Sequence, residues 1–256
     1  MKKQPSDPLA PFTKGTLLTG IRTAPHKILK AADCFIAAAD GISADELGTQ
    51  VGIAAADARK LIRIFHKAVE LRPGERLGGI VQIDEGVLLL DTVEDGGDPQ
   101  TRIAIAVENK SGSVGNIALG ILDDASERPW RAFMDMIQRG AAVETYRPEA
   151  YGFGLELNGR KVVPIITHTG GTTRPRLPLC VQVFDHVHKI LGNKYRGEIR
   201  RNNLQGYLDE ISFRWNYRSA LRSAQTELKD RIGNPPYQKQ GLYKDKPDGW
   251  DNPAVP

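Results

Sequence analysis

The sequence predicts an α/β protein, α+β overall, in which helical segments flank a mixed sheet. Apolar residues recur at helical spacing in two stretches between residues 26 and 71. From residue 78 to about 165 the pattern changes to short β-rich runs bounded by Gly, Asp and Asn. Helical spacing returns beyond residue 178. We therefore expect a helical unit, a mixed α/β layer and further helices, in that order.

The composition is that of a globular protein: 256 residues, 40% hydrophobic, 26% charged and a net charge of +4. These values exclude a fibrous or wholly disordered chain. No run approaches the ~20 apolar residues of a membrane-spanning helix, and no apolar stretch follows the basic pair near the start. Two cysteines alone make neither a disulfide framework nor a four-ligand zinc site. We expect a cytoplasmic protein with reduced thiols and no membrane partner.

The N-terminal part divides into an arm and a DNA-binding domain. Residues 1–15 contain three prolines and are expected to be flexible, and residues 16–72 to form a helix-turn-helix domain. Ser43 begins a capping-box pattern, Gly52 can end that short helix, and a second helix can start near Ala55. The second helix carries four basic residues that we expect to contact DNA: Arg59, Lys60, Arg63 and Lys67.

Proline and glycine at 73–74 end the helical region, and the pattern of strands begins. Short runs bounded by turn residues predict strands over residues 78–86, 101–109, 114–122 and 141–145. A helix is expected over 127–139, and Asn158-Gly159 suits a hairpin turn. Helices are expected over residues 181–191, 200–213 and 214–229. Residues 233–256, rich in proline, are expected to be an extended tail, whose 238–256 part has a protein partner in one interpretation.

Charge is distributed unevenly along the chain. Between Leu77 and Thr101 there are acids but no Lys or Arg, whereas Lys and Arg outnumber Asp and Glu from His186 to Lys246. Aromatic residues alternate with these basic ones, which suits a surface facing a polyanion. The alternative is a solvated helix face above an aromatic core. The basic residues expected to contact DNA here are Lys194, Arg196, Arg200, Arg201, Arg214 and Arg218.

The segment 207–218, YLDEISFRWNYR, closely resembles the C-terminal signature of one group of DDE-type insertion-sequence transposases (ISXO-type), YL-x-E-F-x-F-R-x-N-x-R. Residues 11–32 and 78–86 are similar to two further segments of that group, in the same order and spacing. These transposases have an N-terminal zinc ribbon, a helix-turn-helix and an RNase H-like catalytic domain. The resemblance covers roughly residues 10–222 and implies an RNase H-like, transposase-type domain over residues 73–232.

The resemblance also implies a catalytic site of three acidic residues around two divalent ions, Mg²⁺ or Mn²⁺. Carried onto this sequence, the first position is Asp84. Tyr146 occupies the second position and Val181 or Gln182 the third, and none of these supplies a carboxylate. The chain has no C-x-x-C pair for the zinc ribbon either. The DDE site is therefore predicted to be degenerate.

Three carboxylates near these positions are candidates for a shifted site with Asp84: Glu144, Glu149 and Asp185. We expect no metal unless such a site is active. The prediction is a domesticated, transposase-derived protein on the nucleoid. We expect it to bind double-stranded DNA and to act in regulation or nucleoprotein assembly without strand transfer. A homodimer or a higher assembly is compatible with this prediction. The alternatives are an active transposase or nuclease, and a structural or interaction protein that does not bind DNA.

Overall fold

A computed structural model describes most of the chain between residues 16 and 234. The described residues are 16–89, 100–122, 127–146, 156–157, 159–165, 177–194 and 199–234. Helices and one mixed sheet make up this part, so the predicted α/β class is confirmed. The expectations for the arm (1–15) and the tail (238–256) lie outside the described residues.

The helical unit is built from three N-terminal helices and one that returns from the end of the chain. These are α2 (Pro25–Ala37), α3 (Ala44–Val51), α4 (Ala55–Ala68) and α8 (Leu221–Gly233). Phe35 and Phe65 lie at the centre of its apolar core with ring centroids 5.1 Å apart, and Leu228 of α8 is buried in the same core. The single helix predicted over 214–229 is wrong, because the chain turns between Tyr217 and Ala220 before α8 begins.

The sheet has the strand order β3-β2-β1-β4-β6-β5. Its strands are β1 (Ile80–Leu89), β2 (Gln100–Lys110), β3 (Ser113–Leu122), β4 (Ala142–Thr145), β5 (Glu156–Leu157) and β6 (Arg160–Pro164). The first three form an antiparallel meander, while β4 runs parallel to β1 and β6 parallel to β4. The predicted hairpin turn is confirmed, because β5 pairs antiparallel with β6 and Gly159 has a φ of 74°.

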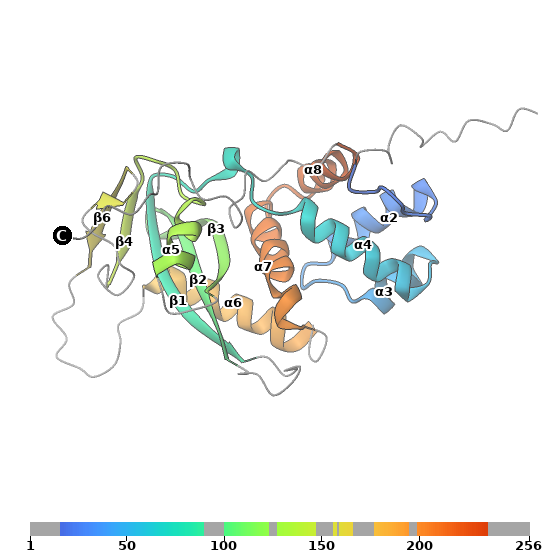
Figure 1. Cartoon of the computed structure of the whole chain (residues 1–256), viewed down its shortest axis with the longest axis horizontal. Helices are drawn as coiled ribbons and strands as arrows, with labels where there is room; N and C mark the ends of the chain where they lie inside the picture. Colours follow the sequence, from blue (N-terminus) through green and yellow to red (C-terminus); the bar gives the residue numbers. More distant parts are fainter. Residues whose placement is uncertain are drawn as a thin grey trace, which may run out of the picture.

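Helices cover both faces of the sheet: α5 (Glu127–Met134) on one, α6 (Pro178–Lys194) and α7 (Arg201–Asn216) on the other (Figure 1). Side chains of β1 alternate between these faces, as successive residues of a strand do. Val81 and Ile83 share a core with Trp130 of α5, whereas Leu88 lies in the core of α6 and α7. The sheet is therefore buried on both sides, which explains its continuous apolar runs.

Helix α5 ends five residues before the predicted end at 139. Backbone N–H groups of Asp135, Met136 and Ile137 turn back to carbonyls only three residues earlier. The Met136 carbonyl and the Gln138 N–H then pair with the backbone of Leu77: the Leu77 N–H donates to Met136, and the Leu77 carbonyl accepts from Gln138. Tertiary pairing with the segment before β1 thus replaces the last helical turn, and the sequence pattern does not contain that information.

Helix α7 stands between the sheet and the helical unit (Figure 1). On one side its Phe213 enters the core of the helical unit. On the other side its polar side chains bind the outer edge of β3. Asn216 accepts from the Ile117 N–H at 2.7 Å and donates to the Ile117 carbonyl at 3.0 Å, and Gln205 bonds the β3 backbone in the same way. The helix therefore covers a strand edge that would otherwise present unpaired backbone groups.

Candidate nucleic-acid interface

A short turn joins α3 to α4, and local sequence fixes both of its ends. Ser43 and Glu46 form the predicted capping box at the start of α3. Gly52 ends that helix in the left-handed region with a φ of 72°, a conformation that glycine adopts without strain. Helix α4 begins at Ala55, as predicted. Lysine ammonium groups of α2 donate at 2.6 Å to carbonyls near the C-terminal end of α3, which holds α3 against α2.

One face of α4 is basic and exposed. We call it the basic face of α4; its residues are Arg59, Lys60, Arg63 and Lys67. At 100° per residue these positions fall within an arc of about 100°, opposite the buried positions of the helix. Arg59 and Lys60 remain 59% and 62% exposed although each has an acidic neighbour, at 3.7 and 3.0 Å. Exposed pairs of this kind are weak, so both cations remain available to a polyanion.

A polar groove of 680 Å³ lies along one flank of the basic face. Residues of α3, α4 and the start of α7 line it, so we call it the α3–α4–α7 groove. Its cationic side chains are Arg59, Arg63 and Arg200, and the amides of Asn202 and Asn203 lie beside them. Helical unit and sheet domain thus contribute to one surface. The two asparagines were missed by the sequence analysis, which considered charge alone.

A second groove, of 360 Å³, lies on the other flank of α4. Lys60 and Asp57 line it together with Arg22 and its neighbours before α2, so we call it the α2–α4 groove. The α4 residues of the two grooves point in directions roughly 140° apart around the helix axis. Arg63 and Lys67 lie between these directions. The exposed ridge of α4 is therefore flanked by polar grooves with cations on both sides.

Arg214 is not on this surface, which corrects its assignment as a DNA contact. Its side chain is 10% exposed, and its guanidinium lies 4.8 Å from the ring centroid of Phe35. It donates to Glu210 Oε1 at 2.6 and 3.0 Å and to backbone carbonyls of Ile36 and Ala38 at the end of α2. The donors are directed into the protein, so Arg214 joins α7 to α2.

Glu210 links this arginine to α4. Its other carboxylate oxygen lies 2.8 Å from His66 Nε2. Burial alone raises the pKa of Glu210, but the Arg214 charge and the hydrogen bond with His66 outweigh it, so that pKa lies below its ordinary value. The ionised carboxylate therefore bridges α4 and α7 beside the α3–α4–α7 groove.

The remaining predicted DNA contacts are divided. Arg200 and Arg201 are exposed at the start of α7. Arg218 is exposed too, but its guanidinium donates to carbonyls of Val114 and Gly115 at the start of β3, at 2.8 and 3.3 Å. Arg196 and the side chain of Lys194 lie outside the described residues.

The candidate carboxylates lie elsewhere, on the sheet face covered by α6. Asp84, at the middle of β1, is 5% exposed. Gln82 pairs with Glu144 in the β1–β4 register and donates to its carboxylate at 3.1 Å. Continuing this register by two residues would place Tyr146 opposite Asp84. Glu144 is thus two residues back along β4, on the same face.

The donors around Asp84 do not fit a pair of divalent ions. Burial raises the pKa of the nearby Cys180 thiol, and the Asp84 charge adds to this, so the thiol stays protonated. Gln82 Oε1 is buried without a hydrogen-bond partner among the described residues, but a neutral amide does not replace a carboxylate. Asp185 is exposed on α6, and Glu149 is outside the described residues. Within the described ranges no three His, Cys, Asp or Glu side chains converge.

Comparison with known proteins adds no family: neither a family model nor a curated protein matches the chain. Among the helices that the structure describes, none combines the length and apolar character needed to cross a membrane.

Proposed function

We propose that this chain is a transposase-derived DNA-binding protein in which α4 enters the major groove of duplex DNA. The observation that carries the proposal is the basic face of α4 with a polar groove on each flank. A helix with its side chains is about 10–12 Å across, and the major groove of B-DNA is about 12 Å wide. A helix seated there has a phosphate backbone on either side, and cations on both flanks of α4 suit that arrangement.

In this arrangement the two phosphate backbones of the DNA contact different residues of the protein. The α3–α4–α7 groove offers Arg59, Arg63 and Arg200 to one backbone, and the α2–α4 groove offers Arg22 and Lys60 to the other. Lys67, near the end of α4, extends the contact along the helix. These are charge contacts, which position a protein on DNA and supply much of its affinity without reading sequence.

The sheet supports a transposase origin with loss of strand transfer. Three antiparallel strands, with parallel strands on the other side of β1, support an RNase H-like origin of the sheet. In this proposal Asp84 is the first acidic position, and Tyr146, which the continued β1–β4 register puts opposite it, stands where a second carboxylate is needed. We therefore propose binding in regulation or nucleoprotein assembly, on the nucleoid, rather than phosphodiester chemistry.

The test is salt-dependent binding of a labelled mixed-sequence duplex, followed by fluorescence anisotropy. Wild type should bind, with an affinity that falls steeply as salt rises. The variant Arg59→Ala/Arg63→Ala/Lys67→Ala should bind more weakly, and the slope of log affinity against log salt should become shallower by about 0.9 per lost phosphate contact.

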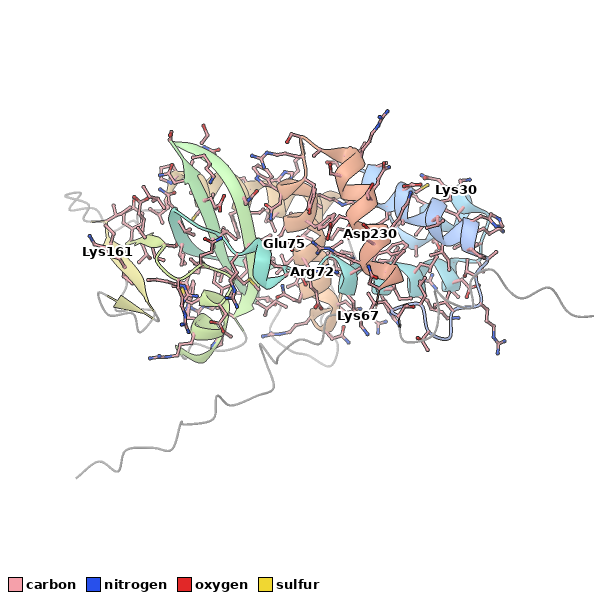
Figure 2. All side chains as sticks on the ribbon, turned by 90° about the horizontal axis from the view of Figure 1, so that it is seen from above. Lys30, Lys67, Arg72, Glu75, Lys161 and Asp230 are labelled. Atoms are coloured by element: carbon pink, nitrogen blue, oxygen red, sulfur yellow. The ribbon has the colours of Figure 1, made fainter. Side chains whose placement is uncertain are left out.

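A control is Arg139→Ala/Lys161→Ala, which removes two exposed cations outside the helical unit. Figure 2 labels Lys161 at the sheet end of the molecule. Equal weakening by both variants, or no binding by wild type at low salt, would contradict the proposal. The same DNA, incubated with Mg²⁺ or Mn²⁺ and run on a denaturing gel, should remain intact. Metal-dependent cleavage lost in Asp84→Ala would instead favour an active transposase.

A further inference from the structure

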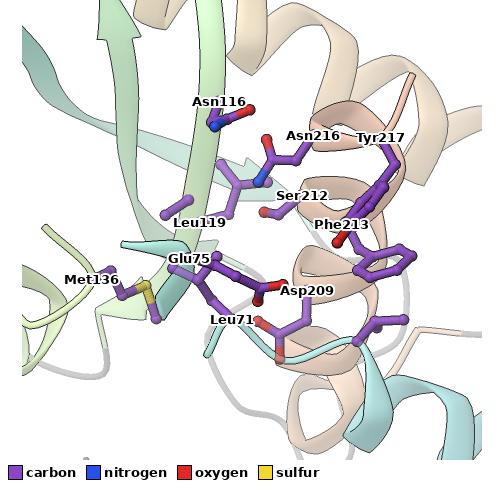
Figure 3. Close-up of a pocket in the computed structure, with 12 residues that line it drawn as sticks. Leu71, Glu75, Asn116, Leu119, Met136, Asp209, Ser212, Phe213, Asn216 and Tyr217 are labelled. Atoms are coloured by element: carbon purple, nitrogen blue, oxygen red, sulfur yellow. The ribbon is translucent and has the colours of Figure 1, made fainter. Parts of the chain in front are cut away.

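A separate cavity, of 180 Å³, lies at the junction of the helical unit and the sheet (Figure 3). Three segments meet around it: the connection from α4 to β1, strand β3, and helix α7. Apolar walls come from each of them, with Leu71, Leu119 and Phe213 among the lining residues. We call it the junction cavity. It is separate from both grooves of α4, because it shares no lining residue with them.

The polar groups of the junction cavity are acceptors for a cation. Glu75, from the connection, and Asp209, from α7, point toward one another across it (Figure 3). Ser212, one turn after Asp209 on α7, lies to one side of the two carboxylates; it is 6% exposed and its hydroxyl has no hydrogen-bond partner among the described residues. Most buried polar groups in proteins are hydrogen-bonded, so an unpaired hydroxyl facing a cavity indicates a missing partner.

Among the described residues that line this cavity, two are acidic and none is Lys or Arg. The Glu75 carboxylate accepts from the Arg231 guanidinium and, at 2.9 Å, from the backbone N–H of Arg72. One Asp209 oxygen accepts from the neutral Gln205 amide at 2.9 Å. Burial raises the pKa of the Tyr217 hydroxyl in the cavity wall, and the charges of Glu75 and Glu227 raise it further while Arg231 opposes them. Deprotonation of Tyr217, which would add a negative charge to the cavity wall, is therefore disfavoured.

We infer that the junction cavity is a binding site for a small primary ammonium compound with a compact apolar body. An ammonium group has three N–H donors, which match Glu75, Asp209 and Ser212 in number and kind. The apolar body would contact Leu71, Leu119 and the other apolar walls. A dry cavity of about 150 Å³ holds benzene, so the volume suits a ligand of that size rather than a nucleotide or a peptide.

Such a ligand would act on the junction rather than on DNA. It touches the connection, β3 and α7 together, and these segments separate when the two units come apart. A ligand that binds only the assembled state stabilises it by mass action. The inference is independent of the proposed DNA binding, since it uses none of the residues of the α4 grooves.

The experiment uses benzylammonium as the probe and benzyl alcohol, similar in size but uncharged, as its control. Wild type should bind benzylammonium saturably in isothermal calorimetry, without DNA, and its melting temperature should rise with ligand concentration. Benzyl alcohol should bind at least tenfold more weakly, because it cannot pair with two carboxylates. Amide chemical shifts of Leu119, Ser212 and Phe213 should change on titration, which locates the ligand without any substitution.

Two variants test the assigned contacts. Asp209→Asn and Ser212→Ala should each lower the affinity for benzylammonium about tenfold or more, and Asp209→Asn should also remove the preference over benzyl alcohol. Asp230→Asn, an exposed acid on α8, is the matched control and should leave the affinity unchanged (Figure 2). The inference fails if wild type shows no saturable binding, if the alcohol binds as well as the ammonium, or if the shifts map to another surface. If a variant does not fold, the amide chemical-shift changes of the wild type on titration determine whether the ligand binds in the junction cavity.

Discussion

Helices α4 and α7 both carry arginines, yet the two helices use them in opposite ways. On α4 the side chain of Arg59 is 59% exposed, and its guanidinium has one acidic neighbour, at 3.7 Å. On α7 the side chain of Arg214 is 10% exposed, and its guanidinium donates to a carboxylate and two backbone carbonyls. The difference lies in the surroundings: Glu210, two backbone carbonyls and Phe35 surround Arg214, whereas solvent surrounds the basic face of α4. Buried partners thus distinguish an arginine that holds the fold from one that can bind another molecule.

The sharpest test of this difference is the stability of Arg214→Ala against that of Arg63→Ala. Removing Arg214 leaves Glu210 charged and buried, so the free energy of unfolding should fall by about 3–5 kcal/mol. Removing Arg63, which has no partner among the described residues, should change it by no more than about 0.5 kcal/mol. Urea denaturation followed by circular dichroism measures both. Similar losses of unfolding free energy in the two variants would contradict the distinction between a structural and an exposed arginine.

Acid should act on the same buried network, with a smaller effect. The pKa of Glu210 is lowered in the folded protein, because the Arg214 charge and the His66 hydrogen bond outweigh burial. A carboxyl with a lowered folded-state pKa stabilises the fold above its unfolded-state pKa, and this contribution disappears as pH falls through the folded-state value. The difference in stability between wild type and Glu210→Gln should therefore be largest near neutral pH and shrink below about pH 4.5. Denaturation curves at several pH values test this, and a difference that grows on acidification would contradict it.

The contact of α7 with the sheet edge gives the next effect. Asn216→Ala removes two hydrogen bonds to Ile117 of β3, at 2.7 and 3.0 Å. A buried backbone group left unpaired costs about 1–3 kcal/mol, and water can reach part of this edge, so we expect a loss of about 1–2 kcal/mol. Hydrogen exchange at the Ile117 amide should accelerate at the same time. Asn216→Asp keeps the acceptor and loses the donor, so it should retain protection of that amide where Asn216→Ala does not.

Local signals explain which elements the sequence predicted. The capping box at Ser43, the left-handed Gly52 and the turn at Gly159 depend on a few neighbouring residues, and all three are present. The early end of α5 and the division of the last predicted helix depend on partners far along the chain. The backbone of Leu77 replaces the last turn of α5, and α8 turns back to pack on the helical unit. Patterns of spacing do not contain such partners.

The candidate site was accessible to the sequence only in part. Helical spacing placed the four cations of α4 on one helix, and their exposure agrees with a binding surface. The neighbouring start of α7, more than 130 residues away, became part of the same groove only through folding. Conversely, the basic and aromatic composition of α7 suggested a DNA surface, whereas Arg214 and Trp215 bind the protein's own backbone. Composition therefore finds charge but does not tell which way it faces.

The smallest expected effect concerns the helix that positions α4. Ser43 Oγ accepts the Glu46 N–H at 3.3 Å, and Glu46 Oε2 accepts the Ser43 N–H at 2.9 Å. Ser43→Ala removes the first of these bonds, and loss of such a cap costs about 1 kcal/mol. Because Ser43 also lines the α3–α4–α7 groove, DNA affinity should fall slightly more than in an equally destabilised variant elsewhere. Ser43→Asn keeps a capping oxygen and should retain the stability, although its larger side chain enters the groove. Weaker DNA binding by Ser43→Asn at unchanged stability would therefore show that DNA contacts the α3–α4–α7 groove. Unchanged DNA binding by both variants would show that Ser43 contributes to stability alone.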